Sequence, residues 1–171
     1  MVSRSLVIGY GNPYRHDDGV GFHLVNRLRG HLGLQALDPE DDGLDGLGHP
    51  VDSVVLHQLL PELAPVLANY QVVVFVDAHA GGIPEEIRLI KVQAEYGFQA
   101  VTHHLSPEML LALVQRSVGQ APPSWLISIH GEDFDFGEGL SPECEKRAKV
   151  AVHKVLELVK TSWENEKELQ V

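Results

Sequence analysis

Three aspartates and a pair of histidines are the residues whose types and spacing could support chemistry. Asp17 and Asp18 stand side by side where a loop enters a helix, Asp77 follows a strongly apolar stretch, and His103-His104 precede another helix start. Carboxylate oxygens and an imidazole nitrogen form a mixed ligand set that zinc or nickel accepts. If these side chains converge, the sequence therefore favours a metal-binding site.

The segment SLVIGYGNPYRHDDGVG, residues 5–21, should position the first carboxylates. Its apolar run at residues 5–8 predicts a central strand that stops at Gly9, and apolar residues at helical spacing from Val20 predict a helix. Aspartate side chains accept from N–H groups at helix starts, so one carboxylate should cap this helix and leave the other over the strand end. The residues alone do not decide between Asp17 and Asp18.

A dinucleotide-binding loop is the competing interpretation of the same segment, because Gly9-Tyr10-Gly11 links a strand to a helix. The pattern fits it poorly: Tyr14 takes the place of the third glycine, and Pro13 has no N–H to donate to a phosphate. The adjacent aspartates would also place negative charge where the pyrophosphate binds. Nucleotide binding therefore stays a weak alternative.

Asp77 and the histidines are predicted to reach the same sheet edge. The β-branched run at residues 71–76 predicts a strand that ends at Asp77, and open α/β sheets bind ligands at the carboxyl ends of their strands. The histidines lie just before Ser106-Pro107-Glu108, which has the residue types of a helix start. Adjacent residues point in different directions, so at most one histidine should serve.

The other elements alternate between strand and helix patterns. Strands are expected at 51–56, 87–92 (half-exposed or at an edge) and 125–129, and helices at 60–70, divided or kinked by Pro65, at 107–118 and from Ser141 onward. This alternation predicts an α/β fold of three layers, α/β/α, with a mainly parallel, twisted sheet of about five strands, like that of phosphorylase and hydrolase folds. An apolar stripe from Val150 to Val159 should pack the final helix on the sheet, with Cys144 structural in its first turn.

The composition indicates one domain spanning residues 1–171. Residues of about 30–50 are acidic and rich in glycine, which predicts a mobile solvated insertion, and their carboxylates lack the spacing of a calcium loop. The formal charge of −11 disfavours nucleic acid and anionic membrane surfaces as partners. One cysteine precludes an intrachain disulfide, and the absence of a signal peptide or a spanning apolar run predicts a cytoplasmic protein.

Several common hydrolase motifs are missing. The chain contains no G-x-S-x-G elbow, no H-E-x-x-H and no convincing cysteine–histidine pairing. Serine, cysteine and thermolysin-like hydrolysis therefore have little support.

Four motifs follow one another along almost the whole length of the chain. They are Gly9-Tyr10-Gly11-Asn12 with Asp17-Asp18-Gly19-Val20-Gly21, Val76-Asp77-Ala78, Thr102-His103 before an apolar helix, and Phe134-Asp135-Phe136-Gly137 with Leu140-Ser141-Pro142. In these motifs and their order the chain resembles the hydrogenase maturation endopeptidases, which process the large subunit of nickel-iron hydrogenases.

The resemblance implies specific roles. Asp18, Asp77 and His103 match the family's metal-binding and catalytic residues, which meet nickel already loaded in the precursor, and Asp17 matches the residue expected to cap the helix. The implied reaction removes a C-terminal extension from the large-subunit precursor by hydrolysis of one peptide bond. Nickel would arrive with this partner, while zinc or cadmium could occupy the site in vitro.

One departure from the family pattern concerns the choice of substrate. Many members follow the second strand with Asp-Gly-Gly, whereas this chain has His57-Gln58-Leu59-Leu60-Pro61-Glu62-Leu63. This variant resembles the branch that serves cytoplasmic, cofactor-linked bidirectional hydrogenases. A nickel-binding maturation chaperone or scaffold without hydrolytic activity stays the main alternative function.

Overall fold

The computed structural model describes residues 4–96 and 104–169, with side-chain surroundings described up to Lys160. The strands are β1 (Ser5–Tyr10), β2 (Val51–Leu56), β3 (Val72–His79), β4 (Ile87–Val92) and β5 (Ser124–His130). The helices are α1 (Val20–His31), α2 (Ala64–Leu67), α3 (Pro107–Val118) and α4 (Pro142–Leu169). Short 3₁₀ turns lie at His16–Gly19 (η1), Leu44–Gly46 (η2) and Pro61–Leu63 (η3).

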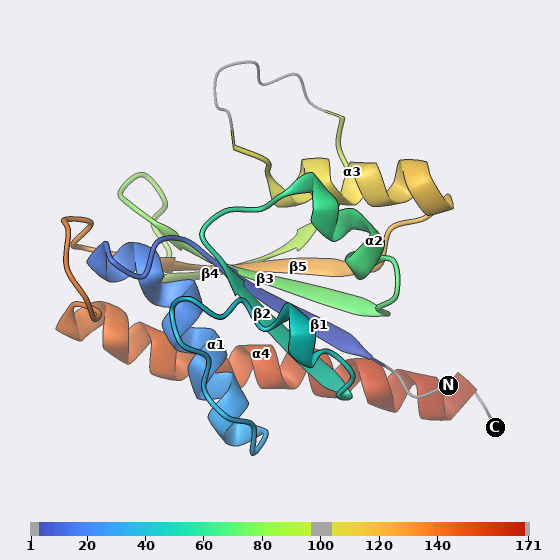
Figure 1. The fold of residues 1–171 in the computed structure, drawn as a ribbon, viewed down its shortest axis with the longest axis horizontal. Helices are drawn as coiled ribbons and strands as arrows, with labels where there is room; N and C mark the ends of the chain where they lie inside the picture. Colours follow the sequence, from blue (N-terminus) through green and yellow to red (C-terminus); the bar gives the residue numbers. More distant parts are fainter. Residues whose placement is uncertain (1–3, 97–103, 170–171) are drawn as a thin grey trace.

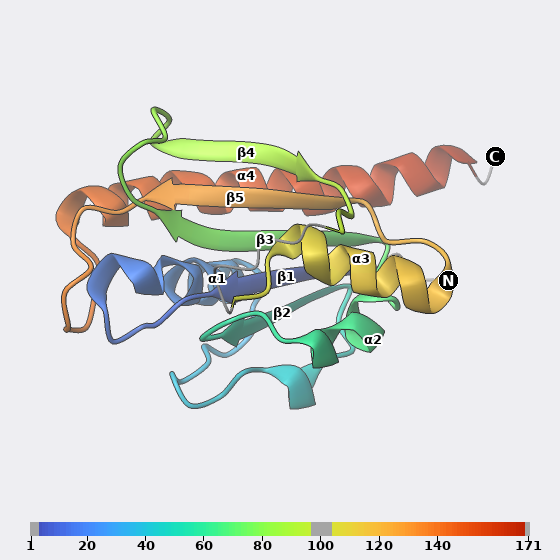
Figure 2. The ribbon, with the colours of Figure 1, turned by 90° about the horizontal axis from the view of Figure 1, so that it is seen from above.

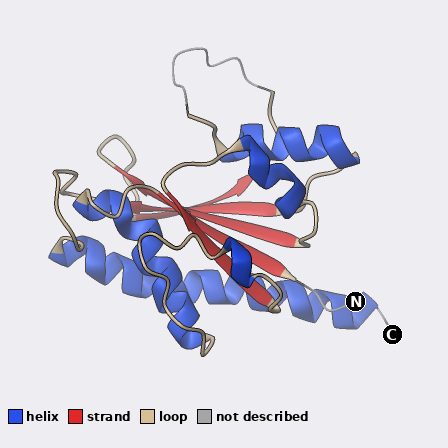
Figure 3. Cartoon of the chain, in the orientation of Figure 1, coloured by secondary structure: helices blue, strands red, loops and turns tan. Residues whose placement is uncertain are grey.

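The five strands form one sheet in the order β2-β1-β3-β5-β4, with α1 and α4 on one face and α2 and α3 on the other (Figure 1). All neighbours pair in parallel except β4, which runs antiparallel to β5 at the edge. The predicted three-layer α/β/α fold and the edge position of residues 87–92 are confirmed. Figure 3 shows the strands fanning between the two helical layers, as the natural twist of a sheet requires.

Alternate residues of the central strands feed two separate cores. Leu6 and Ile8 of β1 pack with the α2 and α3 layer, whereas Val7 packs with α1 and α4. Because both faces are covered, β1 and the first five residues of β3 form nearly continuous apolar runs rather than alternating with polar residues. Within the described residues, no helix is long and apolar enough to cross a membrane.

Two strands are longer than their apolar runs predicted. β1 continues through Gly9 to Tyr10 because β2 pairs with it along its whole length. β3 continues to His79 because β5 pairs with it up to that residue. A Cβ on Gly9 would lie 2.4 Å from the carbonyl oxygen of Gly21, so glycine here lets α1 pack closely on β1. The segment around Pro65 is divided into η3 and α2, as predicted.

The final helix packs through a stripe that differs from the predicted one. Val150 is 54% exposed, and small residues, Ala148 and Ala151, take the place facing the sheet with Val155 and Val159. The prediction for Val150 was wrong because residues one position apart on a helix differ by about 100° in direction. Cys144 is fully buried, and burial raises the pKa of its thiol to about 12, which fits the predicted structural role.

The acidic segment at residues 30–50 is attached to the body of the protein at defined points. Leu37 is buried, and its backbone N–H and C=O both bond to the side chain of Asn26 on α1. Gly43 is buried against Leu37 and Ser53. The mobility of this segment in solution stays a prediction.

Candidate active site at the carboxyl edge of the sheet

The loops that follow β1 and β3 lie at one edge of the sheet because these parallel strands are neighbours. Gly9 pairs with Val76, so Tyr10 and Asp77 come next on adjacent strands. The Tyr10 hydroxyl donates a hydrogen bond to the Asp77 carboxylate. Figure 2 shows η1 and the loop of residues 131–141 at this same end of the sheet.

Asp77 lies inside β3 rather than after it, and it has an unusual charge state. Its Oδ1 accepts a hydrogen bond from its neighbour Ala78 N at 2.8 Å. Burial, the largest cause, and the nearby charge of Asp18 both raise the pKa of Asp77, the hydrogen bonds from Ala78 and Tyr10 lower it, and the net pKa is about 7. The carboxyl group can therefore gain or lose a proton near neutral pH.

Asp18 is held beside this carboxyl by the tight loop that connects β1 to η1. Its Oδ2 accepts from the backbone N–H of Asn12 at 2.7 Å. Gly11 has a φ of +131°, and a Cβ there would lie 2.1 Å from the carbonyl oxygen of Asp18. Only glycine tolerates this close crossing, which turns the Asp18 side chain back toward the end of β1.

Asp17 does not cap α1, contrary to the prediction. The N-cap position of α1 is Gly19, without a side-chain cap. Asp17 is instead fully buried, and its Oδ2 accepts from the N–H groups of Glu132 and Asp133 at 2.7 and 3.1 Å. Ser141 donates its N–H to Oδ1 and its hydroxyl to Oδ2, both at 2.7 Å.

These bonds make Asp17 the anchor of the loop between β5 and α4. Burial alone would raise the pKa of Asp17, but the four hydrogen bonds lower it, so the group stays ionised. Ser141 in turn accepts from Cys144 N at 3.4 Å at the start of α4. The sequence indicates where α1 and α4 begin. It does not indicate the contact between Asp17 and Ser141, which are more than 100 positions apart.

His103 lies outside the described residues, so its place in the site stays a prediction. The nearest described part is the start of α3, where Ser106 accepts from Met109 N at 3.3 Å as the N-cap. Burial and Asp77 raise the pKa of the Tyr10 phenol, and the charge of Glu108 in the first turn of α3 is close enough to add to this shift. His104, next to His103, is exposed.

The described part of the chain supplies two of the three predicted metal ligands. Within it, no group of three or more histidine, cysteine or acidic side chains is arranged to hold a metal ion. Asp18 and Asp77 are close enough to interact electrostatically, and a cation between them would favour the ionised form of Asp77. The donor chemistry fits a divalent metal that receives further ligands from elsewhere.

Several solved structures similar to this one are described as hydrogenase maturation proteases. No family model matches the sequence, and no curated protein is detectably similar to it. The hydrogenase maturating endopeptidase HybD from E. coli superposes with a TM-score of 0.66 at 20% identity, covering 93% of each chain. The chain has the fold of the hydrogenase maturation endopeptidases.

Two archaeal structures extend this comparison. The [NiFe] hydrogenase maturation protease HycI from Thermococcus kodakarensis gives a TM-score of 0.62 at 22% identity, over 92% of this chain and 93% of that one. A hydrogenase 2 maturation peptidase from Thaumarchaeota archaeon SCGC_AB-539-E09 gives 0.61 at 24% identity, over 92% and 99%. The resemblance inferred from the motifs is thus confirmed at the level of the maturation endopeptidase fold.

Two features of the site were missed from sequence. The hydrogen bond between the phenol of Tyr10 and Asp77 was not predicted. The hydrogen bonds by which Asp17 joins the loop of residues 131–141 to η1 were not predicted either. The pairing of strands that places Tyr10 beside Asp77 is the signal that could have revealed the first.

Proposed function

We propose that this chain is a hydrogenase maturation endopeptidase that removes a C-terminal extension from the nickel-loaded precursor of a nickel-iron hydrogenase large subunit. One observation carries the proposal: in this fold, Asp18 and the partly buried Asp77 lie together at the carboxyl edge of the sheet. Two carboxyl groups that destabilise each other's charge are matched to a cationic group on a substrate.

In this proposal the metal belongs to the substrate. Asp18, Asp77 and His103 would contact the nickel of the precursor, while zinc or cadmium would occupy the same groups in vitro. His103 stands four residues before Pro107, the first residue of α3, whose first turn contains Glu108 near Tyr10. This short connection supports a position for the histidine within reach of the two carboxylates.

The chain's own groups can handle the protons of peptide hydrolysis. The ionised Asp77 carboxylate, the form that a neighbouring cation favours, can accept a proton from water and return it to the departing amine. Tyr10 and the Ala78 N–H hold this carboxyl in one orientation. Asp18, fixed by Asn12, supplies the second carboxylate. The reaction would take place in the cytoplasm, on a precursor that carries its metal but has not yet been cleaved.

The decisive experiment incubates the protein with nickel-loaded and nickel-free large-subunit precursor and measures the precursor mass. Release of a C-terminal peptide only from the nickel-loaded form supports the protease. Binding of the precursor without cleavage would support the nickel-binding scaffold instead. The precursor of a bidirectional, cofactor-linked hydrogenase is the first choice of substrate because the segment His57–Leu63 replaces the common Asp-Gly-Gly.

Matched variants separate the site from general charge effects. Asp18→Asn and Asp77→Asn should each abolish cleavage while the protein stays folded. Asp38→Asn changes the same charge at an exposed position in residues 30–50 and should cleave like the parent. Equal losses in all three variants would contradict the assignment of the site.

A further inference from the structure

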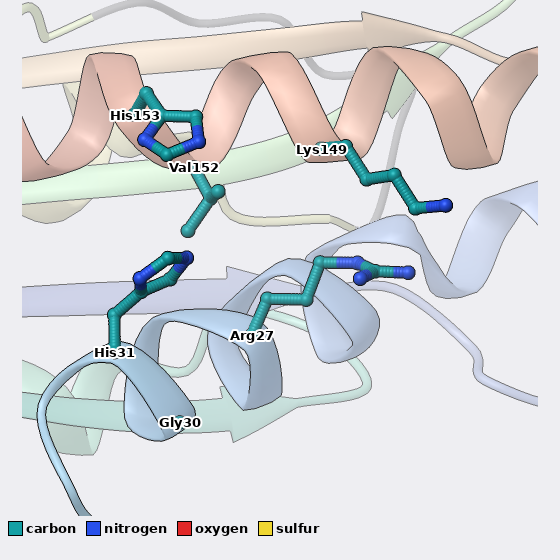
Figure 4. A pocket seen from close by; sticks show the side chains of 6 residues that line it. All are labelled: Arg27, Gly30, His31, Lys149, Val152 and His153. Atoms are coloured by element: carbon teal, nitrogen blue, oxygen red, sulfur yellow. The ribbon is translucent and has the colours of Figure 1, made fainter.

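A groove between α1 and α4 lies on the helical layer formed by these two helices. It has a volume of about 560 Å³ and is lined by six residues: Arg27, Gly30, His31, Lys149, Val152 and His153. Figure 4 shows Arg27 and Lys149 extending at one end, while the rings of His31 and His153 lie next to each other at the other.

The lining of this groove is basic, although the whole chain has a formal charge of −11. All four of its ionisable lining residues carry, or can carry, a positive charge. The two imidazole rings have centroids 5.4 Å apart. Such a local reversal of sign in an acidic protein favours an anion.

The groove's cations are only partly neutralised by the protein. Glu145 accepts a hydrogen bond from Arg27 and lies 3.8 Å from the ammonium group of Lys149. One carboxylate thus serves two cations, and the Lys149 side chain remains 61% exposed. Either cation could therefore donate to an additional acceptor.

The carbonyl groups at the end of α1 are already occupied. The N–H groups of Leu32, Gly33 and Leu34 donate to carbonyls of residues 28–30. The backbone acceptors of residues 28–30 are thus satisfied within the chain, so the side chains of the lining are the groups that face a ligand.

We propose that the groove binds a small multivalent oxyanion of the phosphate class. Arg27 and Lys149 would donate charged hydrogen bonds at one end, and imidazole N–H groups would donate at the other. The groove has one apolar lining residue, Val152, so it recognises the phosphate groups rather than an attached base or chain. A divalent metal ion on the two imidazoles would be repelled by both neighbouring cations.

Pyrophosphate is a suitable probe, titrated calorimetrically into the metal-free protein at low salt. We expect saturable binding of one ion per chain, weakened at high salt. ADP should bind about as well as pyrophosphate, because only the phosphates are held.

Four variants define the result. Lys149→Gln should weaken binding about tenfold, the usual effect of losing one charge-assisted hydrogen bond, and His31→Gln should weaken it less. Glu145→Gln should strengthen binding because it releases both cations. Lys154→Gln removes the same charge from an exposed position of α4 outside the groove and should bind like the parent.

Three outcomes would overturn the proposal. The first is the absence of saturable binding up to about 10 mM pyrophosphate. The second is an equal loss of pyrophosphate affinity in Lys149→Gln and Lys154→Gln. The third is weaker binding in Glu145→Gln when thermal unfolding shows that variant to be folded. Nickel binding that depends on His31, without any pyrophosphate binding, would identify the groove as a metal site instead.

Discussion

Replacing Asp77 by asparagine should make the protein more stable at pH 8 and leave its stability near pH 4 unchanged. The folded state raises the pKa of Asp77 from an ordinary 3.8 to about 7, chiefly through burial. The folded state therefore binds this proton more tightly than the unfolded state. The contribution of Asp77 to the free energy of unfolding is greatest below pH 4, falls as the pH rises, and is lost above about pH 7.

The size of the effect follows from the two pKa values. A pKa difference of one corresponds to about 1.36 kcal/mol, so 7 minus 3.8 gives at most about 4 kcal/mol. Asparagine carries no charge at either pH and can still accept from Ala78 N and pair with Tyr10. We expect the variant to gain about 2 to 4 kcal/mol at pH 8.

Urea unfolding at intervals from pH 4.5 to pH 8.5 would measure this difference, with Asp38→Asn as the exposed control. The free energies of unfolding of the parent and Asp77→Asn should diverge as the pH rises toward about 7, and the difference should then stay constant up to pH 8.5. Parallel curves, or a variant less stable than the parent at pH 8, would refute the argument that burial keeps the carboxyl protonated. Loss of precursor cleavage in a variant of higher stability would separate the functional role of Asp77 from any role in folding.

Three other predictions concern the elements around the site. Asp17→Ala should destabilise the protein by about 3 kcal/mol or more in urea unfolding, because it removes a buried carboxylate that accepts four hydrogen bonds; a change below about 1 kcal/mol would show that the loop of residues 131–141 does not depend on it. Cys144 should resist alkylation at pH 8 until the protein unfolds, since burial raises the pKa of the thiol to about 12; rapid labelling of the folded protein would contradict this. Replacing Asp41, Asp42 and Asp45 together by asparagine should slow association with the precursor at low salt and matter less at high salt, because these exposed charges act over about 8 Å at physiological ionic strength. A lower single-turnover cleavage rate of the preformed complex at every salt concentration would instead place them in the active site.

The local patterns of the sequence were sufficient to predict the elements and their layers. Apolar runs at residues 5–8, 51–56 and 71–76 need both faces covered, and helices beginning near Val20 and Ser106 cover them. Because parallel strands place their carboxyl ends at one edge, the proximity of Asp18 and Asp77 also followed from pattern alone. Gly11, next to Pro13, marked the tight loop that turns Asp18 toward this edge.

Long-range packing decided what the patterns left open. Asp17 and Asp18 are chemically identical neighbours, and only the return of the loop at residues 131–141 makes one of them a buried anchor. The length of β3 depends on pairing with β5, and the pKa of Asp77 depends on how deeply that pairing buries it. The basic groove requires α1 and α4 to lie side by side, although Arg27 and Lys149 are more than 100 residues apart. Hydrogen-bond partners, burial and local charge are properties of the space around a residue, and the tertiary fold creates that space.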